Sequence, residues 1–421
     1  MNKPSNAKGI CRLAILAGVL ATTPVLAAES ADLDLRVKAL EHELQSLKQQ
    51  MNDTRQQSET AAMQSRGDTS LAKFQVGGYG TAGYTASDQA IDAFDPVAFN
   101  PIFEFQYGDD WLFAAELELE ANEEGETETK LEFATATWLA NDYMAIQVGK
   151  WLSPFGQFQD RLHPSWINKL PDAPVGYGEH GVLPLSEVGA QVRGGIPLGR
   201  SIINYVVGVG NGPKLGDQGA TTVGLAADNN NNKSLTGRLG IIPVPNVEVG
   251  ASFMNAKITG DDPAGTPCDA VGPGQACFAT TGDYTLWGAD VAITPGPLDL
   301  RGEYTHAQLK SINGRLAEGD NHTIVVPKTT WKIWYVQMAY QLRGLSESVW
   351  LDKWEPVVRY GEMKVDGYDG FAGDAQKRWD VGLNYLFTPT IIGKLAWEQR
   401  NYDDPATQDE KLLMMQLAFG F

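Results

Sequence analysis

The segment that most clearly indicates the fold is KLLMMQLAFGF, residues 411–421. Every second side chain from Leu413 to Phe421 is large and apolar, whereas the residues between them include Gln416 and Gly420. Because strand side chains alternate between the two faces of a sheet, one face of this segment is apolar and the other is partly small or polar. Such a strand suits a wall with hydrocarbon on one side and water on the other.

The same alternation recurs from position 74 to position 421, in segments of about ten residues separated by turn residues. These segments predict sixteen strands, an even number, as single-chain bacterial barrels have. The predicted strands are Phe74–Ala86, Val97–Tyr107, Trp111–Ala121, Thr129–Leu139, Tyr143–Lys150, Glu187–Ile196, Ser201–Gly210, Ser234–Ile242, Val247–Lys257, Tyr284–Thr294, Leu298–Leu309, Thr330–Leu342, Lys353–Val365, Lys377–Phe387, Ile391–Tyr402 and Lys411–Phe421. We therefore predict an all-β fold, a 16-stranded antiparallel transmembrane β-barrel preceded by a short α-helical coiled coil.

The connections alternate between short and long, as the periplasmic turns and external loops of outer-membrane barrels do. A soluble β-sandwich would also have alternating strands, but it would not require this rhythm. Aromatic residues gather near the predicted strand ends, which is typical of the belts at the two membrane interfaces. These residues are Trp111, Trp138, Trp151, Trp287, Trp331, Trp350, Trp379 and Tyr402.

The first 27 residues have the layout of a cleavable signal peptide. Basic residues up to Arg12 precede an apolar run, Leu13 to Leu20, and small residues follow as far as Ala27. The apolar run is shorter than the ~20 residues that a membrane-spanning helix needs. We expect cleavage after Ala27 and export of the remaining chain; the alternative is an uncleaved anchor helix.

A short helix is predicted between the signal peptide and the barrel. Apolar residues between Leu33 and Met51 follow one another in steps of four and three, which is the seam of a heptad repeat. We assign residues 28–58 to a coiled coil, 59–73 to a polar linker and 74–421 to the barrel. A lone amphipathic helix lying on the barrel domain is the alternative for the first of these segments.

Charge and cysteine content restrict the partners. The formal net charge is -19, which argues against a nucleic-acid partner. Cys268 and Cys277 form a close pair in an exported chain, and a disulfide is favoured over a metal site because residues 261–283 contain no His and no further Cys. We assign no cofactor and no metal.

The alternating strand that ends in Phe419 and Phe421 resembles the C-terminal strand signal of Gram-negative outer-membrane porins. This implies recognition by the barrel-assembly machinery. A signal peptide, a coiled coil, a linker and a sixteen-strand barrel together resemble the O/P-type, phosphate-selective porin superfamily. The resemblance implies a cell outer membrane location with the coiled coil in the periplasm, and contact with outer-membrane lipids and lipopolysaccharide. It also implies a homo-oligomer, most simply a trimer, that allows passive diffusion of small hydrophilic solutes or ions.

In such porins the third external loop folds into the barrel and narrows it, and the matching segment here is 151–186. The side chains expected to narrow the pore are Asp160, Arg161, His163, Lys169 and Asp172. This mixture of acids and bases departs from the lysine- and arginine-lined constriction of phosphate-selective members.

The polar faces of the strands are predicted to line the water-filled lumen. Acids predominate in the second to fourth strands and bases in later ones, which would set a field across the pore. Alternatively, these charges are hydrated and paired with neighbours across strands. The selected wall residues are Glu116, Glu118, Arg193, Arg238, Arg301, Arg359, Arg378, Lys394 and Arg400.

Two other functions were considered. In the first, the barrel is a structural anchor and the coiled coil tethers it to the envelope. In the second, His306 belongs to a membrane-embedded hydrolase, but position 308 is Gln where a nucleophilic Ser would be needed. We therefore predict that the chain is not an enzyme, and we keep the tether as the alternative.

Overall fold

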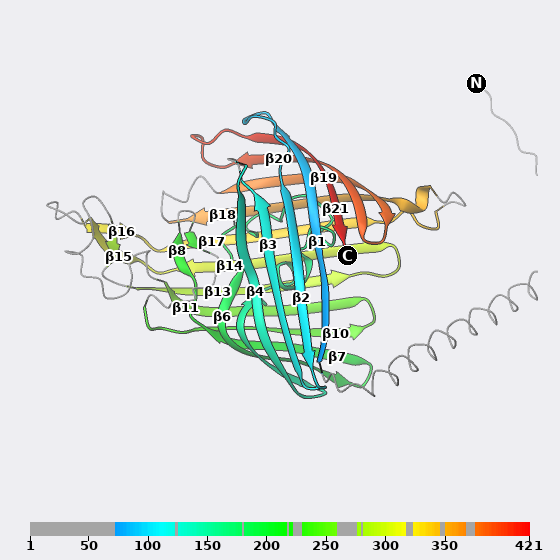
Figure 1. The fold of residues 1–421 in the computed structure, drawn as a ribbon. Helices are drawn as coiled ribbons and strands as arrows, with labels where there is room; N and C mark the ends of the chain where they lie inside the picture. The colour runs from blue at the N-terminus through cyan, green and yellow to red at the C-terminus, as the bar shows by residue number, and fades with distance from the viewer. Residues whose placement is uncertain are drawn as a thin grey trace, which may run out of the picture. The chain divides into compact units, whose positions relative to one another are not determined.

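The computed structural model describes residues 72–122, 125–178, 181–216, 219–221, 230–258, 276–278, 281–316, 323–345, 350–367 and 375–421. Within them, sixteen antiparallel strands form one closed barrel, and the first and last strands lie side by side (Figure 1). The predicted signal peptide, coiled coil and Cys268 lie outside the described residues. No helix within the described ranges has the length and apolar character needed to cross a membrane.

The barrel strands follow chain order around the ring. They are β1 (Ala72–Ser87), β2 (Val97–Tyr107), β3 (Trp111–Ala121), β4 (Thr127–Asn141), β5 (Met144–Leu152), β6 (Ser186–Leu198), β7 (Ser201–Gly210), β10 (Ser234–Val244), β11 (Val247–Ile258), β13 (Gly282–Ile293), β14 (Leu298–Leu309), β17 (Thr329–Tyr340), β18 (Trp354–Asp366), β19 (Gln376–Thr388), β20 (Ile391–Tyr402) and β21 (Glu410–Gly420).

The sixteen predicted strands are confirmed, and their ends differ from the predicted ends by at most two residues. Several short elements in the long connections were not predicted. They are β8 (Lys214–Gly216), β9 (Gly219–Thr221), β12 (Ala276–Phe278), β15 (Ile312–Leu316), β16 (Thr323–Val326), the π-helix η1 (Phe158–Leu162) and the 3-10 helix η3 (Leu351–Lys353). Each has at most five residues, too few for a periodic pattern to be recognised.

Pairing of β1 with β21 closes the ring, so these two strands leave no free sheet edge. Beyond the end of β21, Phe421 and Gly78 exchange two backbone hydrogen bonds of 3.0 and 3.2 Å. Gly78 has φ +148°, and a Cβ at this position would collide with the carbonyl oxygen of Asn100. A glycine is therefore required where the chain closes the barrel.

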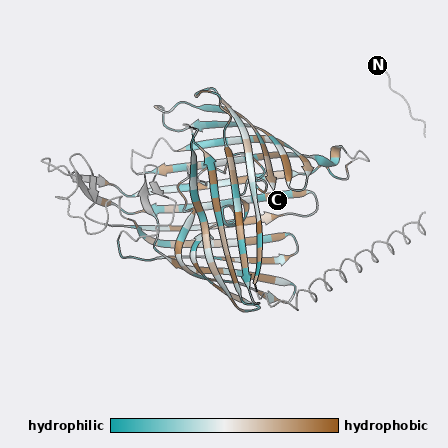
Figure 2. Ribbon diagram, viewed as in Figure 1, coloured by the Kyte–Doolittle hydropathy of each residue, from teal (hydrophilic) through white to brown (hydrophobic). Residues whose placement is uncertain are grey.

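The outer and inner faces of β21 match the sequence pattern. Leu413 and Met415 point outward and are 40% and 48% exposed, whereas Met414 and Gln416 point inward and are buried. Figure 2 shows apolar and polar residues alternating along many of the barrel strands. The outward side chains form an apolar surface, as a strand in contact with hydrocarbon requires.

The prediction of aromatic belts needs correction at two positions. Trp111, Trp138 and Trp287 are exposed on the barrel, as an interfacial belt requires. Trp151 and Trp331, in contrast, are 2% and 0% exposed. They occupy inward positions of β5 and β17, so they pack inside the barrel rather than against lipid headgroups.

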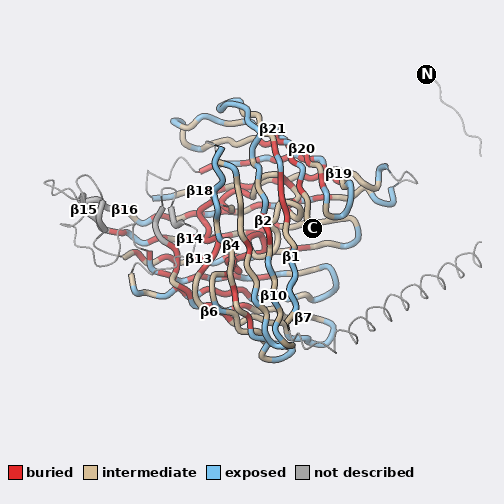
Figure 3. Tube along the Cα trace, in the orientation of Figure 1, coloured by how far each residue is buried: buried red, intermediate tan, exposed pale blue. Residues whose placement is uncertain are grey.

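An apolar cluster fills part of the barrel interior. Phe155, Tyr177 and Val182, from the connection between β5 and β6, pack with wall residues that include Leu286 and Ile333. Figure 3 shows buried residues along β14 and β18, on the wall next to this cluster. The apolar contacts fix the connection against one side of the barrel.

Candidate functional site

The described part of the connection between β5 and β6, residues 153–178 and 181–185, lies inside the barrel. Its side chains contact several inward positions of the wall: Leu170 lies next to Gly382 of β19, and Trp166 lies next to Gly420 of β21. A Cβ on Gly382 would lie 2.6 Å from Leu170 Cδ2, so this wall position has no room for a larger side chain. We call residues 153–178 and 181–185 the inner loop.

One carboxylate of β14 anchors the first turn of the inner loop. Glu303 accepts hydrogen bonds from the backbone N–H groups of Gln157 and Phe158 at 3.2 and 3.0 Å. It also accepts bonds from the hydroxyl groups of Tyr177 and Tyr335 at 3.1 and 2.7 Å. Gly156 has φ +71°, and a Cβ there would collide with the Glu303 carboxylate. A buried carboxylate with four donors holds the loop firmly.

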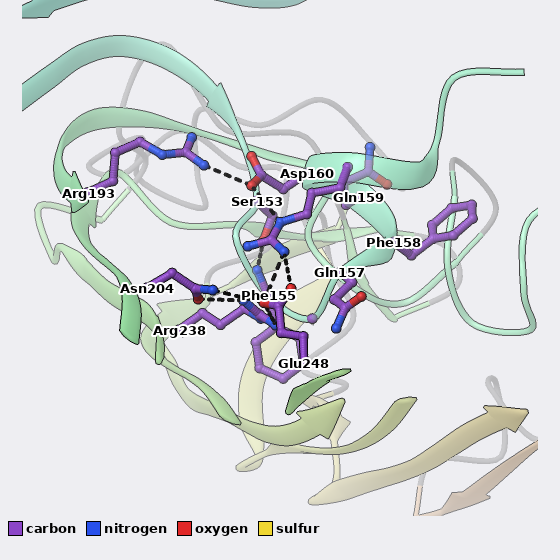
Figure 4. Close-up of polar contacts among 12 residues, drawn as sticks. Ser153, Phe155, Gln157, Phe158, Gln159, Asp160, Arg193, Asn204, Arg238 and Glu248 are labelled. Carbon is purple, nitrogen blue, oxygen red and sulfur yellow. Dashed lines mark hydrogen bonds and ion pairs between the residues drawn. The ribbon is translucent and has the colours of Figure 1, made fainter. Parts of the chain in front are cut away.

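A second group of contacts ties the inner loop to β6 and to β10–β11. The carboxylate of Asp160 accepts a hydrogen bond from Arg193 at 2.9 Å, and Arg161 forms an ion pair with Glu248 at 2.9 Å. Glu248 also accepts a bond from Arg238 at 2.8 Å, as the dashed lines in Figure 4 show. Two predicted wall bases are thus joined to two predicted loop residues through carboxylates.

A third group ties the middle of the inner loop to β18, β19 and β20. Asp172 Oδ2 accepts hydrogen bonds from Arg378 at 2.9 Å and from Arg400 at 3.0 Å. Arg359 of β18 donates to the Asp172 carbonyl oxygen at 3.1 Å and forms a buried ion pair with Asp380. A single aspartate therefore connects the loop with three neighbouring strands.

Lysines complete this third group. The Lys169 ammonium forms an ion pair with Glu355 of β18 at 2.8 Å. Lys394 of β20 donates to the carbonyl oxygens of Ser165 and Asn168 at 2.5 and 2.8 Å. Both lysines hold the loop, one through its own side chain and one from the wall.

His163 contacts the loop itself and the opposite wall. Its Nδ1–H donates to the Gln159 carbonyl oxygen at 2.7 Å, and its ring meets the Tyr79 ring edge-on, with 6.4 Å between centroids. Burial lowers the pKa of His163 to about 4. The imidazole is therefore neutral at pH 7.

The remaining predicted wall residues have mixed surroundings. Arg301 bonds with Asp299 at 2.7 Å and with the inner-loop side chain of Gln157 at 3.2 Å. Glu116 of β3 is buried and accepts a hydrogen bond from the Tyr79 hydroxyl at 2.7 Å. Glu118, its inward neighbour, forms an ion pair with Lys130 at 3.7 Å. The acid-rich character of the second to fourth strands thus persists in the folded barrel.

Sequence reasoning missed two anchors of the loop. Tyr177 lies in a segment without periodicity, so no pattern indicated that its hydroxyl would reach Glu303. Glu355 alternates with outward residues at the start of β18, and this parity could have indicated an inward carboxylate. Its pairing with Lys169 could not be foreseen, because the path of the loop is not encoded in a repeat.

A cavity of ≈ 480 Å³ lies between the inner loop and the opposite wall. The wall residues that line it include Thr81 of β1, Glu118 of β3, Glu132 of β4 and Gln416 of β21, and His163 lines it from the loop. No group of three or more His, Cys, Asp or Glu residues in the described part of the chain is arranged to hold a metal ion.

Comparison with known families gives a match in the C-terminal part of the chain. Residues 271–421 match the family of phosphate-selective porins O and P. This chain resembles an O/P-type porin. A comparison with curated proteins found no match.

Solved outer-membrane barrels have folds similar to that of this chain. OmpF of Salmonella typhi, in a complex with daunomycin, has a TM-score of 0.52 at 14% identity over 83% of this chain and 98% of its own. The outer membrane channel DcaP of Acinetobacter baumannii has a TM-score of 0.51 at 13% identity over 84% and 99%. An anion-selective porin from Comamonas acidovorans has a TM-score of 0.50 at 11% identity over 83% and 100%.

Proposed function

We propose that this chain is an outer-membrane porin through which small hydrophilic solutes and ions diffuse passively, along a lumen narrowed by the inner loop. The observation that supports this function is the attachment of the loop to the inner wall, through Glu303, Glu248 and the arginines around Asp172. When space remains beside it, a loop fixed inside a barrel reduces the cross-section of the lumen without closing the lumen.

The two faces of the barrel wall support the same function. Outward apolar side chains such as Leu413 suit hydrocarbon, and inward charged side chains such as Glu118 suit water. Passage along such a lumen needs no energy source, because size and charge alone decide which solutes enter.

The assembly of the porin is also part of the proposal. Phe419 and Phe421 lie beside each other at the end of β21, with ring centroids 6.5 Å apart, and would be read by the barrel-assembly machinery. The exposed apolar wall would contact outer-membrane lipids and lipopolysaccharide. The predicted periplasmic coiled coil would join three copies.

Planar-bilayer recording tests the function. The full-length mature protein, folded in detergent and added to one chamber, should give discrete and long-lived conductance steps in potassium chloride. Neutral sugars of increasing size should pass until a cut-off is reached, which liposome swelling would measure. Folded protein that inserts but gives no steps and passes no sugar would contradict the proposal.

The tether remains the second candidate, and the same protein distinguishes it. Removal of residues 32–70 should leave the unit conductance unchanged if the barrel is the working part. A loss of envelope attachment after this deletion, with a non-conducting barrel, would favour the tether.

A further inference from the structure

The cavity beside the inner loop is lined by more carboxylates than cationic groups. Among the described residues that line it, Arg400 is the only arginine or lysine. Its guanidinium already donates to three carboxylates, those of Glu398, Asp172 and Glu410, at 2.5, 3.0 and 3.1 Å. The lining carboxylates are Asp95, Glu118, Glu120, Glu132 and Asp172.

The bases close to this cavity do not reverse its sign. Lys130 of β4 lies 3.7 Å from Glu118 and 3.3 Å from Glu120, and Lys150 of β5 interacts electrostatically with Glu132. The five lining carboxylates outnumber the four bases that line the cavity or interact with them, which are Arg400, Lys130, Lys150 and Arg378. His163 adds no charge at neutral pH, since burial lowers its pKa to about 4.

Other cationic side chains of the described interior bond with the inner loop or with carboxylates of the wall. Arg193, Arg378 and Lys394 each bond with a carboxylate or a carbonyl oxygen of that loop. Arg359 and Arg238 are buried in ion pairs with Asp380 and Asp290. An anion entering the lumen would have to compete with these bonds for the guanidinium and ammonium groups.

A second observation concerns uncharged groups that line the same cavity. Gln416 and Thr81 are only 5% and 8% exposed, yet Gln416 Oε1 and Thr81 Oγ1 have no hydrogen-bond partner within the described part of the chain. His163 Nε2 also has no partner there, and it is an acceptor because the proton is on Nδ1. Buried acceptors without a donor are rare in folded proteins, so Gln416 Oε1 and His163 Nε2 indicate a group that donates, and the Thr81 hydroxyl can accept from the same group.

We propose that the channel prefers cations, and that the cavity between the inner loop and β1–β4 is a weak binding site for solutes with protonated amines. An ammonium group has three N–H donors and no acceptor, which complements an acceptor-lined cavity with excess carboxylates. Inorganic phosphate, with the opposite charge and several acceptor oxygens, does not fit this lining. The inference rests on the proposed diffusion function and specifies its selectivity.

Reversal potentials in a potassium chloride gradient test the preference. The current through wild-type channels should reverse at a potential whose sign indicates that potassium is more permeable than chloride. In the triple variant Glu118→Gln, Glu120→Gln and Glu132→Gln, the reversal potential should move most of the way toward zero. A wild-type channel that reverses on the chloride side would overturn the inference while leaving the diffusion function intact. A folded protein without any channel would contradict both.

A matched control separates local from overall charge. Asp109→Asn, Asp110→Asn and Asp142→Asn remove the same formal charge from exposed short turns at one end of the barrel. This control should keep the wild-type reversal potential. An equal shift in both triple variants would contradict the assignment of selectivity to the cavity, because it would trace the effect to net charge.

Amine binding is tested with two probes on the same channel. Spermidine should reduce the potassium current in a voltage-dependent manner, whereas inorganic phosphate at equal concentration should not. The double variant Thr81→Val and Gln416→Met should weaken the spermidine block severalfold, because it removes two acceptors from the cavity. Block by phosphate without block by spermidine would refute the site, as would a double variant that is blocked like wild type.

Discussion

Charge has different partners on the two sides of this barrel. On the side formed by β6 to β20, arginines such as Arg193 and Arg378 bond with carboxylates of the inner loop. On the side formed by β1 to β4, Glu118 and Glu132 line an open cavity. The comparison teaches that a count of wall charges does not predict selectivity, because charges bonded to the inner loop position that loop, whereas charges that line the cavity meet the solutes.

The largest expected effect on the difference between the two sides comes from removing Glu303, the buried carboxylate that anchors the inner loop. Glu303→Ala leaves two backbone N–H groups and two tyrosine hydroxyls without their acceptor. We expect a loss of about 3 kcal/mol or more in unfolding free energy, since each orphaned buried donor has a desolvation cost. Chemical unfolding in detergent measures this loss, and bilayer recordings should show a larger and noisier conductance.

Glu104→Ala is the control for the anchor variant. Glu104 occupies an inward position of β2 on the opposite wall and is half-buried. Its removal should leave stability and noise close to wild type. If both alanine variants lost the same free energy, Glu303 would have no special role in holding the loop.

A decrease in pH should also weaken the attachment of the inner loop, through His163, but by a smaller free energy than the loss of Glu303. Burial places the pKa of His163 at about 4, below its usual value of about 6.5 in an unfolded chain. Between these values the unfolded chain binds the extra proton, so stability is complete above pH 6.5 and falls as pH is lowered toward 4. The loss is at most about 3 kcal/mol.

His163→Gln isolates this contribution. The variant cannot take up the proton, so its stability between pH 7 and pH 4 should decline less steeply than that of wild type, as urea unfolding would measure. Parallel pH profiles of the two proteins would show that another group is responsible.

The smallest effect is expected at Asp172, which lies at the boundary between the loop-bonded side and the cavity side of the barrel. Asp172 belongs to the loop, lines the cavity and bonds with Arg378 and Arg400, both of which keep other partners. Asp172→Asn should therefore cost only about 1 kcal/mol. It should also shift the reversal potential slightly toward chloride, and an opposite shift would contradict the assigned role.

The strands were predictable because inside and outside differ so strongly in polarity. The alternation in β21, for example, follows from Gln416 and Leu413 meeting different surroundings. The same reasoning was wrong for Trp331, because β17 is apolar on both faces where the inner loop covers its inward side. Period-two patterns cannot distinguish a lipid-facing tryptophan from one packed against a loop.

The inner loop was located by the sequence, but its contacts were not predictable. Asp160, Arg161 and Lys169 were selected as charged residues of the longest connection, with no indication of their partners. Those partners lie between 33 and 186 positions away along the chain. Only the closed ring brings them together, and this also applies to the acceptors Thr81 and Gln416 in the cavity.

The most direct test of the central claim, that the inner loop narrows an otherwise wider lumen, is the single-channel conductance of a protein lacking residues 160–172. The account predicts a larger unit conductance than wild type, in protein with unchanged β-sheet content by circular dichroism. An unchanged conductance in that folded variant would contradict the account.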